Sequence, residues 1–340
     1  MEDMMNKVFN EDCLETMKRM EDKSVNLIVA DFPYFEVKGD FDFIWKSFDE
    51  FLEWVEVVAK EFKRILADNG SLYVYGHAKK IAYKQILFDK YFKLENNLKW
   101  YKTDCQTRIG FEEFNSYPPV TEHILFYSNG GTLDDIEEEF IKPKNPFSLY
   151  LKEEFKKANI TNREIAKLFP SKTGGLTGCV SNWINGDNII TEEQYRIVRE
   201  YLKCNFLNKP YKDLREEYKS LRKKYEELIR PFNNKYRHDD VLMYAQEVNI
   251  TGKYDHPTQK PPKLSRALIE TSTRKGDLVY IPFGGSGVEV EQCEILGLDW
   301  ITGDLEKKYC DMIENRVKNA KGEVGLFSED MGKNIQGSLF

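Results

Sequence analysis

The sequence contains no long apolar run. No stretch approaches the roughly 18–20 uncharged apolar residues that a membrane span needs. The N-terminus is acidic and lacks the apolar core of a signal peptide. We therefore expect a cytoplasmic protein without a membrane partner.

Closely spaced cysteines are also absent. A chain of 340 residues needs no disulfide framework to stabilise its core, and there is no CxxC pair to suggest zinc. This spacing predicts reduced, mostly packed thiols and no metal site. The cysteines are Cys13, Cys105, Cys179, Cys204, Cys293 and Cys310.

The chain lacks an excess of positive charge, since its formal net charge is −7. Phosphate contacts need local Lys and Arg, so this sum argues mildly against a nucleic-acid partner. A basic face can nevertheless exist on an acidic molecule. The interpretation of function must therefore come from local features.

Residues 7–130 read as alternating strands and helices. Ser24–Ala30 is a short apolar run typical of a buried strand, and Phe48–Leu66 has the apolar spacing of an amphipathic helix that Asp68–Gly70 is expected to stop. After residue 256 the strand and helix pattern resumes. Strands interleaved with helices predict an α/β fold with a parallel sheet and helices on both faces.

Residues 131–250 differ in character, being strongly charged and helical in pattern. We expect one catalytic domain built from 1–130 and 251–325, with the helical region 131–250 inserted between its halves. Residues 326–340 would form a C-terminal tail.

Two segments have residue types suited to chemistry. Phe283–Gly287 is a glycine-rich turn between a predicted strand and helix, and Asp304 lies about 20 residues further on, where an acid typically binds ribose hydroxyls. Asp31–Tyr34 places a carboxylate, a proline and an aromatic ring at the end of a strand. Taken singly, each pattern is more often explained by tight packing or by a strand-ending turn.

Together these segments resemble the amino-methylating DNA methyltransferases in their beta arrangement, where the catalytic motif comes first and the cofactor motif last. The resemblance covers about 1–130 and 253–320, and its motifs stand in the family's order. The family's catalytic Asp-Pro-Pro-Tyr appears as Asp-Phe-Pro-Tyr at 31–34, and its His-Pro-Thr-Gln-Lys-Pro is intact at 256–261. The cofactor motif Asp-Pro-Phe-x-Gly-Ser-Gly appears as Ile-Pro-Phe-Gly-Gly-Ser-Gly at 281–287 and is followed by the acidic stretch Asp304–Tyr309. Asn10–Cys13 resembles the family's Gly-Asp-Cys.

The resemblance implies a Rossmann-like fold and methyl transfer from S-adenosylmethionine to N6 of an adenine flipped out of double-stranded DNA. Asp31 and the carbonyl of Phe32 would accept hydrogen bonds from the amine. Pro33 would fix the turn and Tyr34 would stack on the base. A motif that starts with Asp favours adenine, because the family's cytosine members usually start with Ser.

The resemblance also assigns cofactor contacts. Lys260 and Ser286 would bind the methionine carboxylate, Asp304 the ribose, and Asp12 and Cys13 the adenine ring. The remaining cofactor contacts are Thr258, Phe283, Gly285 and Gly287. Alternatives are a surface lysine at 260 and a helix cap at 12.

Two positions depart from the family pattern. Phe32 replaces a proline, which alters how tightly the turn holds the base. Ile281 replaces an aspartate that is the expected partner of the methionine ammonium. We therefore hypothesise weak cofactor binding unless another acid or a carbonyl takes its place.

The inserted region is our candidate for target recognition. Residues 161–202 resemble a helix-turn-helix whose second helix would present Thr177, Ser181 and Asn182 to base edges. A plain three-helix support is the alternative. The helix predicted over 211–230 would place Lys219 and Arg222 on phosphates, unless these side chains are merely solvated.

Other interpretations stay open at this stage. They are a cytosine-N4 methyltransferase, a DNA-binding protein with weakened catalysis, and a nicotinamide dehydrogenase, against which the motif at 256–261 argues. A homodimer is left open. The ending Gln336–Phe340 resembles a sliding-clamp-binding peptide, although so short a match is easily accidental.

Overall fold

We describe the fold from a computed structural model of the chain. The structure describes residues 1–35, 44–104, 117, 119–130, 145–246 and 259–327. Two compact units are present, one formed by Met1–Gly131 and Arg230–Phe340 and the other by Thr132–Ile229. The inserted unit thus ends before the expected boundary at 250, because residues after Arg230 add a strand to the sheet of the first unit.

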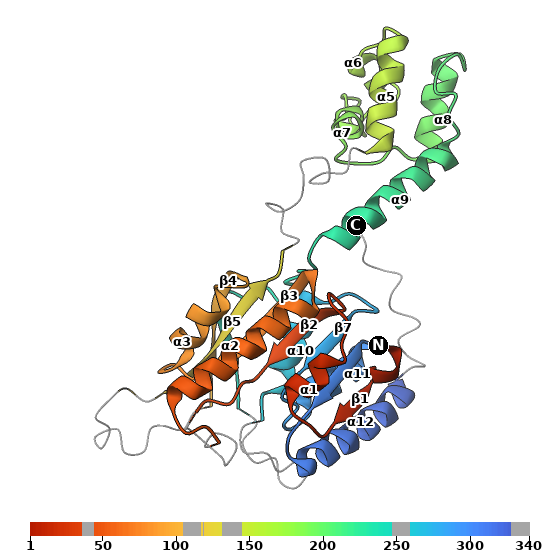
Figure 1. Cartoon of the computed structure of the whole chain (residues 1–340). Helices are drawn as coiled ribbons and strands as arrows, with labels where there is room; N and C mark the ends of the chain where they lie inside the picture. The colour runs from red at the N-terminus through yellow and green to blue at the C-terminus, as the bar shows by residue number, and fades with distance from the viewer. Residues whose placement is uncertain (36–43, 105–116, 118, 131–144, 247–258, 328–340) are drawn as a thin grey trace. The chain divides into compact units, whose positions relative to one another are not determined.

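The first unit is built on one mixed sheet (Figure 1). Within the described residues the sheet has eight strands in the order β1-β8-β7-β2-β3-β5-β4-β6. The first five strands of this order are mutually parallel, β5 is antiparallel to both neighbours, and β6 is parallel to β4. The strands are β1 (Lys7–Phe9), β2 (Val25–Ala30), β3 (Leu66–Gly76), β4 (Lys93–Lys102), β5 (Thr121–Ser128), β6 (Val241–Tyr244), β7 (Leu278–Ile281) and β8 (Asp299–Gly303).

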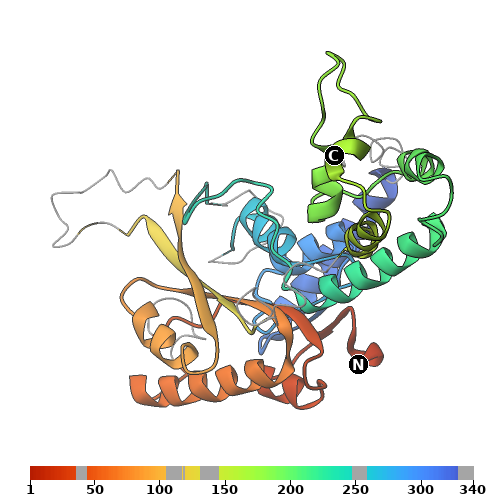
Figure 2. The same cartoon turned by 90° about the horizontal axis from the view of Figure 1, so that it is seen from above.

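Helices cover both faces of this sheet, as the sequence pattern predicts (Figures 1 and 2). Successive residues of β2 alternate between two cores: Ile28 and Ala30 enter the first, and Leu27 and Val29 enter the second. Helices α1 (Cys13–Lys18), α2 (Phe48–Ile65) and α3 (Ile81–Phe88) pack on the first core, and α10 (Pro262–Ser272), α11 (Val288–Leu296) and α12 (Lys307–Phe327) flank the second. No helix in the described part of the chain combines the length and apolarity that a bilayer crossing requires.

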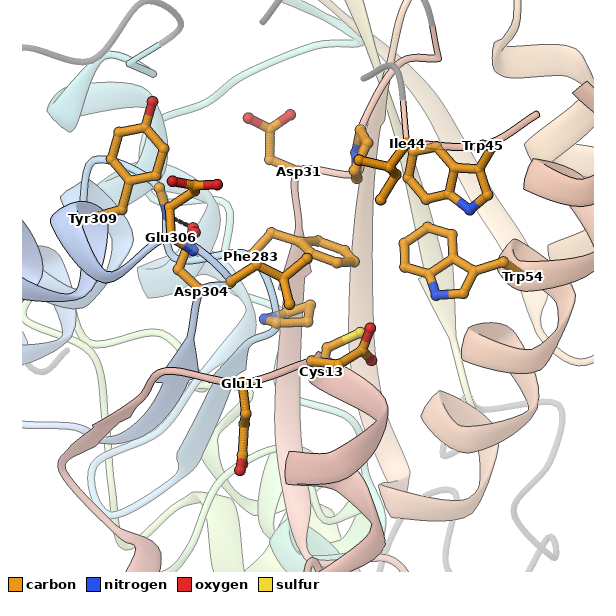
Figure 3. Close-up of a pocket in the computed structure, with 15 residues that line it drawn as sticks. Glu11, Cys13, Asp31, Ile44, Trp45, Trp54, Phe283, Asp304, Glu306 and Tyr309 are labelled. Carbon is orange, nitrogen blue, oxygen red and sulfur yellow. Dashed lines mark hydrogen bonds between the residues drawn. The ribbon is translucent and has the colours of Figure 1, made fainter. Parts of the chain in front are cut away.

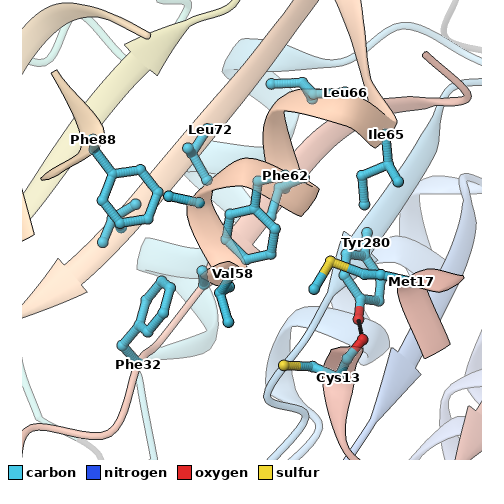
Figure 4. Packing of buried hydrophobic residues seen from close by; sticks show 14 of the residues in the cluster. Cys13, Met17, Phe32, Val58, Phe62, Ile65, Leu66, Leu72, Phe88 and Tyr280 are labelled. Carbon is cyan, nitrogen blue, oxygen red and sulfur yellow. Dashed lines mark hydrogen bonds between the residues drawn. The ribbon is translucent and has the colours of Figure 1, made fainter. Parts of the chain in front are cut away.

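Helix α2 shows why these segments fold as they do. Ser47 caps it by accepting a hydrogen bond from the backbone N–H of Glu50, and its apolar residues recur at helical spacing. Val58 and Phe62 are fully buried in the first core (Figure 4). The helix ends at Ile65, slightly before the expected stop at Asp68–Gly70, and the chain enters β3 at Leu66. Residues 67–70 lie in a register irregularity, and regular pairing begins at Ser71.

The order of the strands creates a crevice between β2 and β7. The chain runs from β2 through α2 to β3 on one side, and from β7 through α11 to β8 on the other. Ligands of open α/β sheets bind at such a reversal, beside the carboxyl ends of the strands.

The chain leaves and re-enters the first unit at the other end of the strands from this crevice. β5 ends at Ser128, which pairs with Ser71 at the start of the regular part of β3, and the N–H of Asn129 donates to the carbonyl of Gly70 at 3.1 Å. On the return path, the guanidinium of Arg230 lies 3.4 Å from the hydroxyl of Ser71. Both connections therefore lie at the amino ends of the parallel strands.

The inserted unit is helical and has its own core. Its helices are α5 (Pro146–Lys157), α6 (Asn162–Ala166), α7 (Cys179–Asn185), α8 (Glu192–Tyr201) and α9 (Tyr211–Leu228). Capping boxes at Thr161 and Thr191 start α6 and α8. Ile165, Val180 and Trp183, which belong to the helix-turn-helix candidate, are buried together in this core.

Candidate active site

A cavity of about 360 Å³ lies where β1, β8, β7 and β2 end (Figure 3). This volume is within the roughly 300–1,000 Å³ of small-molecule sites. One side chain from each strand end lines it: Asp12 after β1, Asp304 after β8, Phe283 after β7 and Asp31 after β2. The other lining residues are Glu11, Cys13, Pro33, Ile44, Trp45, Trp54, Pro282, Gly285, Leu305, Glu306 and Tyr309.

The carboxylate of Asp31 is held by two donors. Its Oδ1 accepts a hydrogen bond from the hydroxyl of Tyr34 at 2.8 Å, and its Oδ2 lies 3.0 Å from Nζ of Lys260. The Asp31 side chain is 27% exposed, so it remains accessible from the cavity. Lys260 is 3% exposed and is therefore not a surface lysine.

Glu122, on β5, completes this cluster, and the sequence interpretation missed it. Its Oε2 lies 3.0 Å from Nζ of Lys260 and 3.2 Å from the Tyr34 hydroxyl, and its Oε1 lies 2.6 Å from Nζ of Lys102. Burial alone would raise the pKa of Glu122, but the two lysines outweigh it and lower the pKa to about 2. No local motif marks Glu122; the only sequence signal is an acid entering an otherwise apolar strand.

The charges of this cluster are fixed by their neighbours. Burial disfavours the charge on Lys260, yet Asp31 and Glu122 raise its pKa, so the ammonium stays protonated. Burial and the same two carboxylates raise the pKa of the Tyr34 hydroxyl, which stays a neutral donor. Lys260, assigned by resemblance to the cofactor, is in this structure the partner of the Asp31 carboxylate.

The glycine turn is tied to the acid after β8. Oδ2 of Asp304 accepts the backbone N–H of Gly285 and its Oδ1 accepts that of Glu306, each at 2.9 Å. Burial raises the pKa of Asp304. Gly287 has a positive φ of 75°, and a Cβ there would meet Ile313 at 3.0 Å, so this position requires glycine. Ser286 is buried and does not line the cavity.

At the end of β1, Asp12 has both of the roles considered from sequence. Its carboxylate caps α1 by accepting the N–H of Leu14 at 2.7 Å, and it also lines the cavity. Cys13 beside it is buried, and this burial raises the pKa of its thiol.

The two departures from the family pattern are both buried. Phe32 is 1% exposed, and its ring centroid lies 4.9 Å from that of Phe283 and 5.9 Å from that of Trp54. Ile281 is buried in the second core and does not line the cavity. Acids that do line it are Glu11, Asp12, Asp31, Asp304 and Glu306.

Several expected residues lie elsewhere. Thr258, the preceding residues 256–257 and the ending Gln336–Phe340 fall outside the described residues, as does Cys105. The candidate DNA contacts lie in the inserted unit. Of these, Ser181 is exposed and Asn182 half-buried on α7.

The other three candidate DNA contacts differ in how their side chains are used. The hydroxyl of Thr177 donates to the carbonyl of Phe169 at 2.9 Å. On α9, Lys219 forms a 3.2 Å ion pair with Glu216, and Arg222 is exposed.

Comparison with known proteins agrees with this geometry. A family model described as DNA methylase, covering N6 and N4 methyltransferases, matches residues 25–315. The chain belongs to this DNA methylase family. This membership confirms the resemblance found in the motifs.

Among curated relatives of this DNA methylase, the type II methyltransferase M.HinfI of Haemophilus influenzae is 25% identical over 94% of this chain and 70% of its own length. M.BamHI of Bacillus amyloliquefaciens is 25% identical over 96% of this chain, which spans 60% of that relative's length. The DNA adenine methyltransferase YhdJ of Escherichia coli is 22% identical, with 90% and 80% covered.

Solved structures share the fold of this methylase. A DNA modification methylase from Thermus thermophilus superposes with a TM-score of 0.50 at 15% identity, covering 92% of this chain and 95% of that one. PvuII DNA methyltransferase, which is cytosine-N4-specific, gives a TM-score of 0.50 at 13% identity, covering 94% and 93%. The M1.HpyAVI structure, with a TM-score of 0.50 at 15% identity, is a SAM complex and covers 92% of this chain and 98% of its own. The expected methyltransferase fold is therefore confirmed, and methyltransferases of this family use S-adenosylmethionine.

Proposed function

We propose that this chain transfers a methyl group from S-adenosylmethionine to N6 of an adenine that is flipped out of double-stranded DNA at a specific sequence. One observation carries the proposal: Asp31 opens into the same cavity that Phe283 and Asp304 line. A methyl acceptor held at Asp31 would therefore face a cofactor held by the adjoining strand ends.

The cavity fits this cofactor, which supplies a methyl group on a positively charged sulfonium. Asp304 would hold the ribose hydroxyls, Phe283 would form an apolar wall, and Asp12 and Cys13 would meet the adenine ring. The carboxylates around the cavity favour a cation. Ile281 offers no partner to the methionine ammonium, so we expect a dissociation constant above the micromolar level unless one of the acids that line the cavity takes that place. A sub-micromolar value by calorimetry would show that one of them does.

The cluster at Asp31 suits activation of an amine. An exocyclic amino nitrogen is a poor nucleophile because its lone pair is delocalised into the ring. Hydrogen bonds accepted by Asp31 and by the Phe32 carbonyl favour a tetrahedral nitrogen, which resembles the transition state. Lys260 and Glu122 fix the carboxylate in place, and Tyr34 must release its hydrogen bond to Asp31 before its ring can stack on the base.

Adenine is our preferred acceptor because the motif begins with Asp, and because a relative, YhdJ, is a DNA adenine methyltransferase. Cytosine N4 is the second candidate, favoured by the fold shared with the cytosine-N4-specific PvuII enzyme. We further propose that the inserted unit reads the target sequence through α7.

Methyl transfer to unmethylated DNA tests the proposal directly. Tritium from the labelled cofactor should enter DNA, and nucleoside mass spectrometry should then find N6-methyladenine. N4-methylcytosine would select the second candidate. Absence of transfer by a protein that still binds DNA would leave a DNA-binding protein that has lost catalysis.

A further inference from the structure

Two lysines of α3 reach the backbone of the catalytic turn. Nζ of Lys84 donates to the carbonyl of Pro33 at 3.2 Å and to that of Tyr75, on β3, at 3.4 Å. Lys80, at the N-terminal cap of the same helix, donates from Nζ to the carbonyl of Phe35. Residues four apart lie on one face of a helix, so α3 presents both ammonium groups to this turn together.

Aromatic rings surround both ammonium groups. Lys84 is 1% exposed, and its Nζ lies 4.9 Å from the ring centroid of Phe32 and 5.4 Å from that of Tyr34. Nζ of Lys80 lies 4.5 Å from the ring centroid of Phe35. A cation over the face of an aromatic ring is attracted to it, more so when water is excluded. Phe32 itself lies in the first core with Phe62 and Phe88 (Figure 4).

This turn needs additional support in this chain. The family motif has two prolines, whereas Phe32 takes the place of the first and leaves its own φ unrestrained. Phe35, directly after the motif, has a φ of 59°, a left-handed conformation that a bulky side chain rarely adopts. Such a conformation persists only where the surroundings hold it.

Lys84 restrains the turn at the next residue. The ring of Pro33 fixes its φ, and anchoring its carbonyl to Lys84 fixes its ψ as well. The Phe32 carbonyl and the Tyr34 side chain are then held relative to each other. Lys80 does the same for the carbonyl of the strained Phe35.

We propose that Lys84 and Lys80 are positioning residues that hold the Asp31–Phe35 turn in its methyl-transfer geometry and so replace the missing proline. The inference rests on the proposed function, in which Asp31 and the Phe32 carbonyl accept hydrogen bonds from the target amine. Neither lysine touches the substrate; both act through the backbone of the turn.

The test compares K84M, K84R and K80M with L87A as the matched control. Leu87 lies on the same helix and packs on the same core. For each protein we would measure kcat, KM for DNA, the dissociation constant of S-adenosylhomocysteine by calorimetry, and the thermal midpoint.

We expect K84M to lower kcat by about 10- to 100-fold, as a small misplacement of reacting groups does. Its KM and its S-adenosylhomocysteine affinity should stay within about twofold of wild type, since the binding contacts are untouched. K84R keeps the charge and donors and should restore most of kcat. L87A should lower the thermal midpoint and leave kcat unchanged.

A folded K84M with wild-type kcat would overturn the inference. It would also be overturned if K84M and L87A lost kcat in the same proportion to their loss of thermal stability, because the effect of Lys84 would then be one of stability alone. Should K84M fail to fold, K80M decides, because its side chain is only half-buried and a wild-type kcat there would overturn the inference too. A wild-type protein without methyl transfer would remove the proposed function and this inference with it, whereas an active wild type with an equally active K84M would remove the inference alone.

Discussion

The two units use charged side chains in different ways. In the sheet unit, Lys260 and Glu122 have side chains that are 4% and 14% exposed, and they meet beside the cavity. In the inserted unit, Lys219 and Glu216 form a pair along α9 with side chains 61% and 60% exposed. Burying charges is costly unless they are paired, whereas exposed pairs contribute little to stability. The contrast agrees with the catalytic role that we propose for the buried cluster, since a structural role alone would not favour burying these charges.

The largest effect should come from the carboxylate at the centre of the buried cluster. D31A removes the acceptor for the amine and should lower kcat by at least about 100- to 1,000-fold, the usual loss for one preorganised electrostatic contact. Initial rates of tritiated methyl transfer measure this loss. D68A, on an exposed acid that pairs with Lys23, is the control and should keep full activity. Methyl transfer by D31A at the wild-type rate would show that the buried cluster is not needed for the reaction.

The next effect compares one carboxylate from each unit. E122Q leaves two lysines without their shared negative charge and should destabilise the protein by about 3 kcal/mol, the lower end for breaking a buried pair. E216Q, in the exposed pair, should change stability by less than about 0.5 kcal/mol. Urea unfolding of the two variants beside wild type provides the measurement. Equal losses of unfolding free energy in E122Q and E216Q would show that the buried and the exposed pairs contribute equally to stability.

A third effect concerns base choice and tests whether side chains on α7 of the inserted unit contact the target bases. N182A and S181A would each remove a contact to a base edge, and a good contact is worth about 1–3 kcal/mol of discrimination. We expect methylation to spread to related sites while kcat at the best site stays near wild type. Single-molecule sequencing of DNA from an expressing host shows which sites are modified. An unchanged pattern would exclude α7 from base reading.

The last effect is a dependence of stability on pH. Because the folded-state pKa of Glu122 is lowered to about 2 from an ordinary value of 4.5, its stabilising contribution is complete above that ordinary value. It should be lost progressively as the pH falls from about 4.5 towards 2. Unfolding free energies over this range should therefore fall more steeply for wild type than for E122Q. Parallel curves would mean that Glu122 is not held ionised by its lysines.

The sequence predicts those parts of the site that lie on short contiguous motifs. Asp31, Phe283 and Asp304 each follow an apolar strand, and parallel strands bring their carboxyl ends to one edge of the sheet. The short continuous apolar runs of the strands, interleaved with helical segments, likewise predict helices on both faces. These inferences need only local patterns and the known packing of α/β sheets.

The parts that the sequence does not predict depend on contacts between distant segments. Glu122 lies on β5 and Lys84 on α3, and neither is part of a motif, so only the folded chain brings them to the catalytic turn. The boundary expected at 250 is wrong because β6 is a short strand in which only Leu242 is buried, which leaves too weak an alternation to detect. Residues 67–70 keep an irregular path within β3, and regular pairing on both sides begins only at Ser71, so the local helix-stopping signal is only slightly displaced from the end of α2 at Ile65.

The attachment of the inserted unit has a consequence for how such enzymes diversify. The chain leaves the sheet after Ser128 and returns at Arg230, both beside Ser71 and away from the strand ends that carry Asp31 and Asp304. Replacing the segment between these two points with another of different length or sequence would leave the methyl-transfer chemistry intact. Under the proposed role of the inserted unit in reading the target sequence, exchange of this one segment would change DNA specificity without any redesign of the reaction itself.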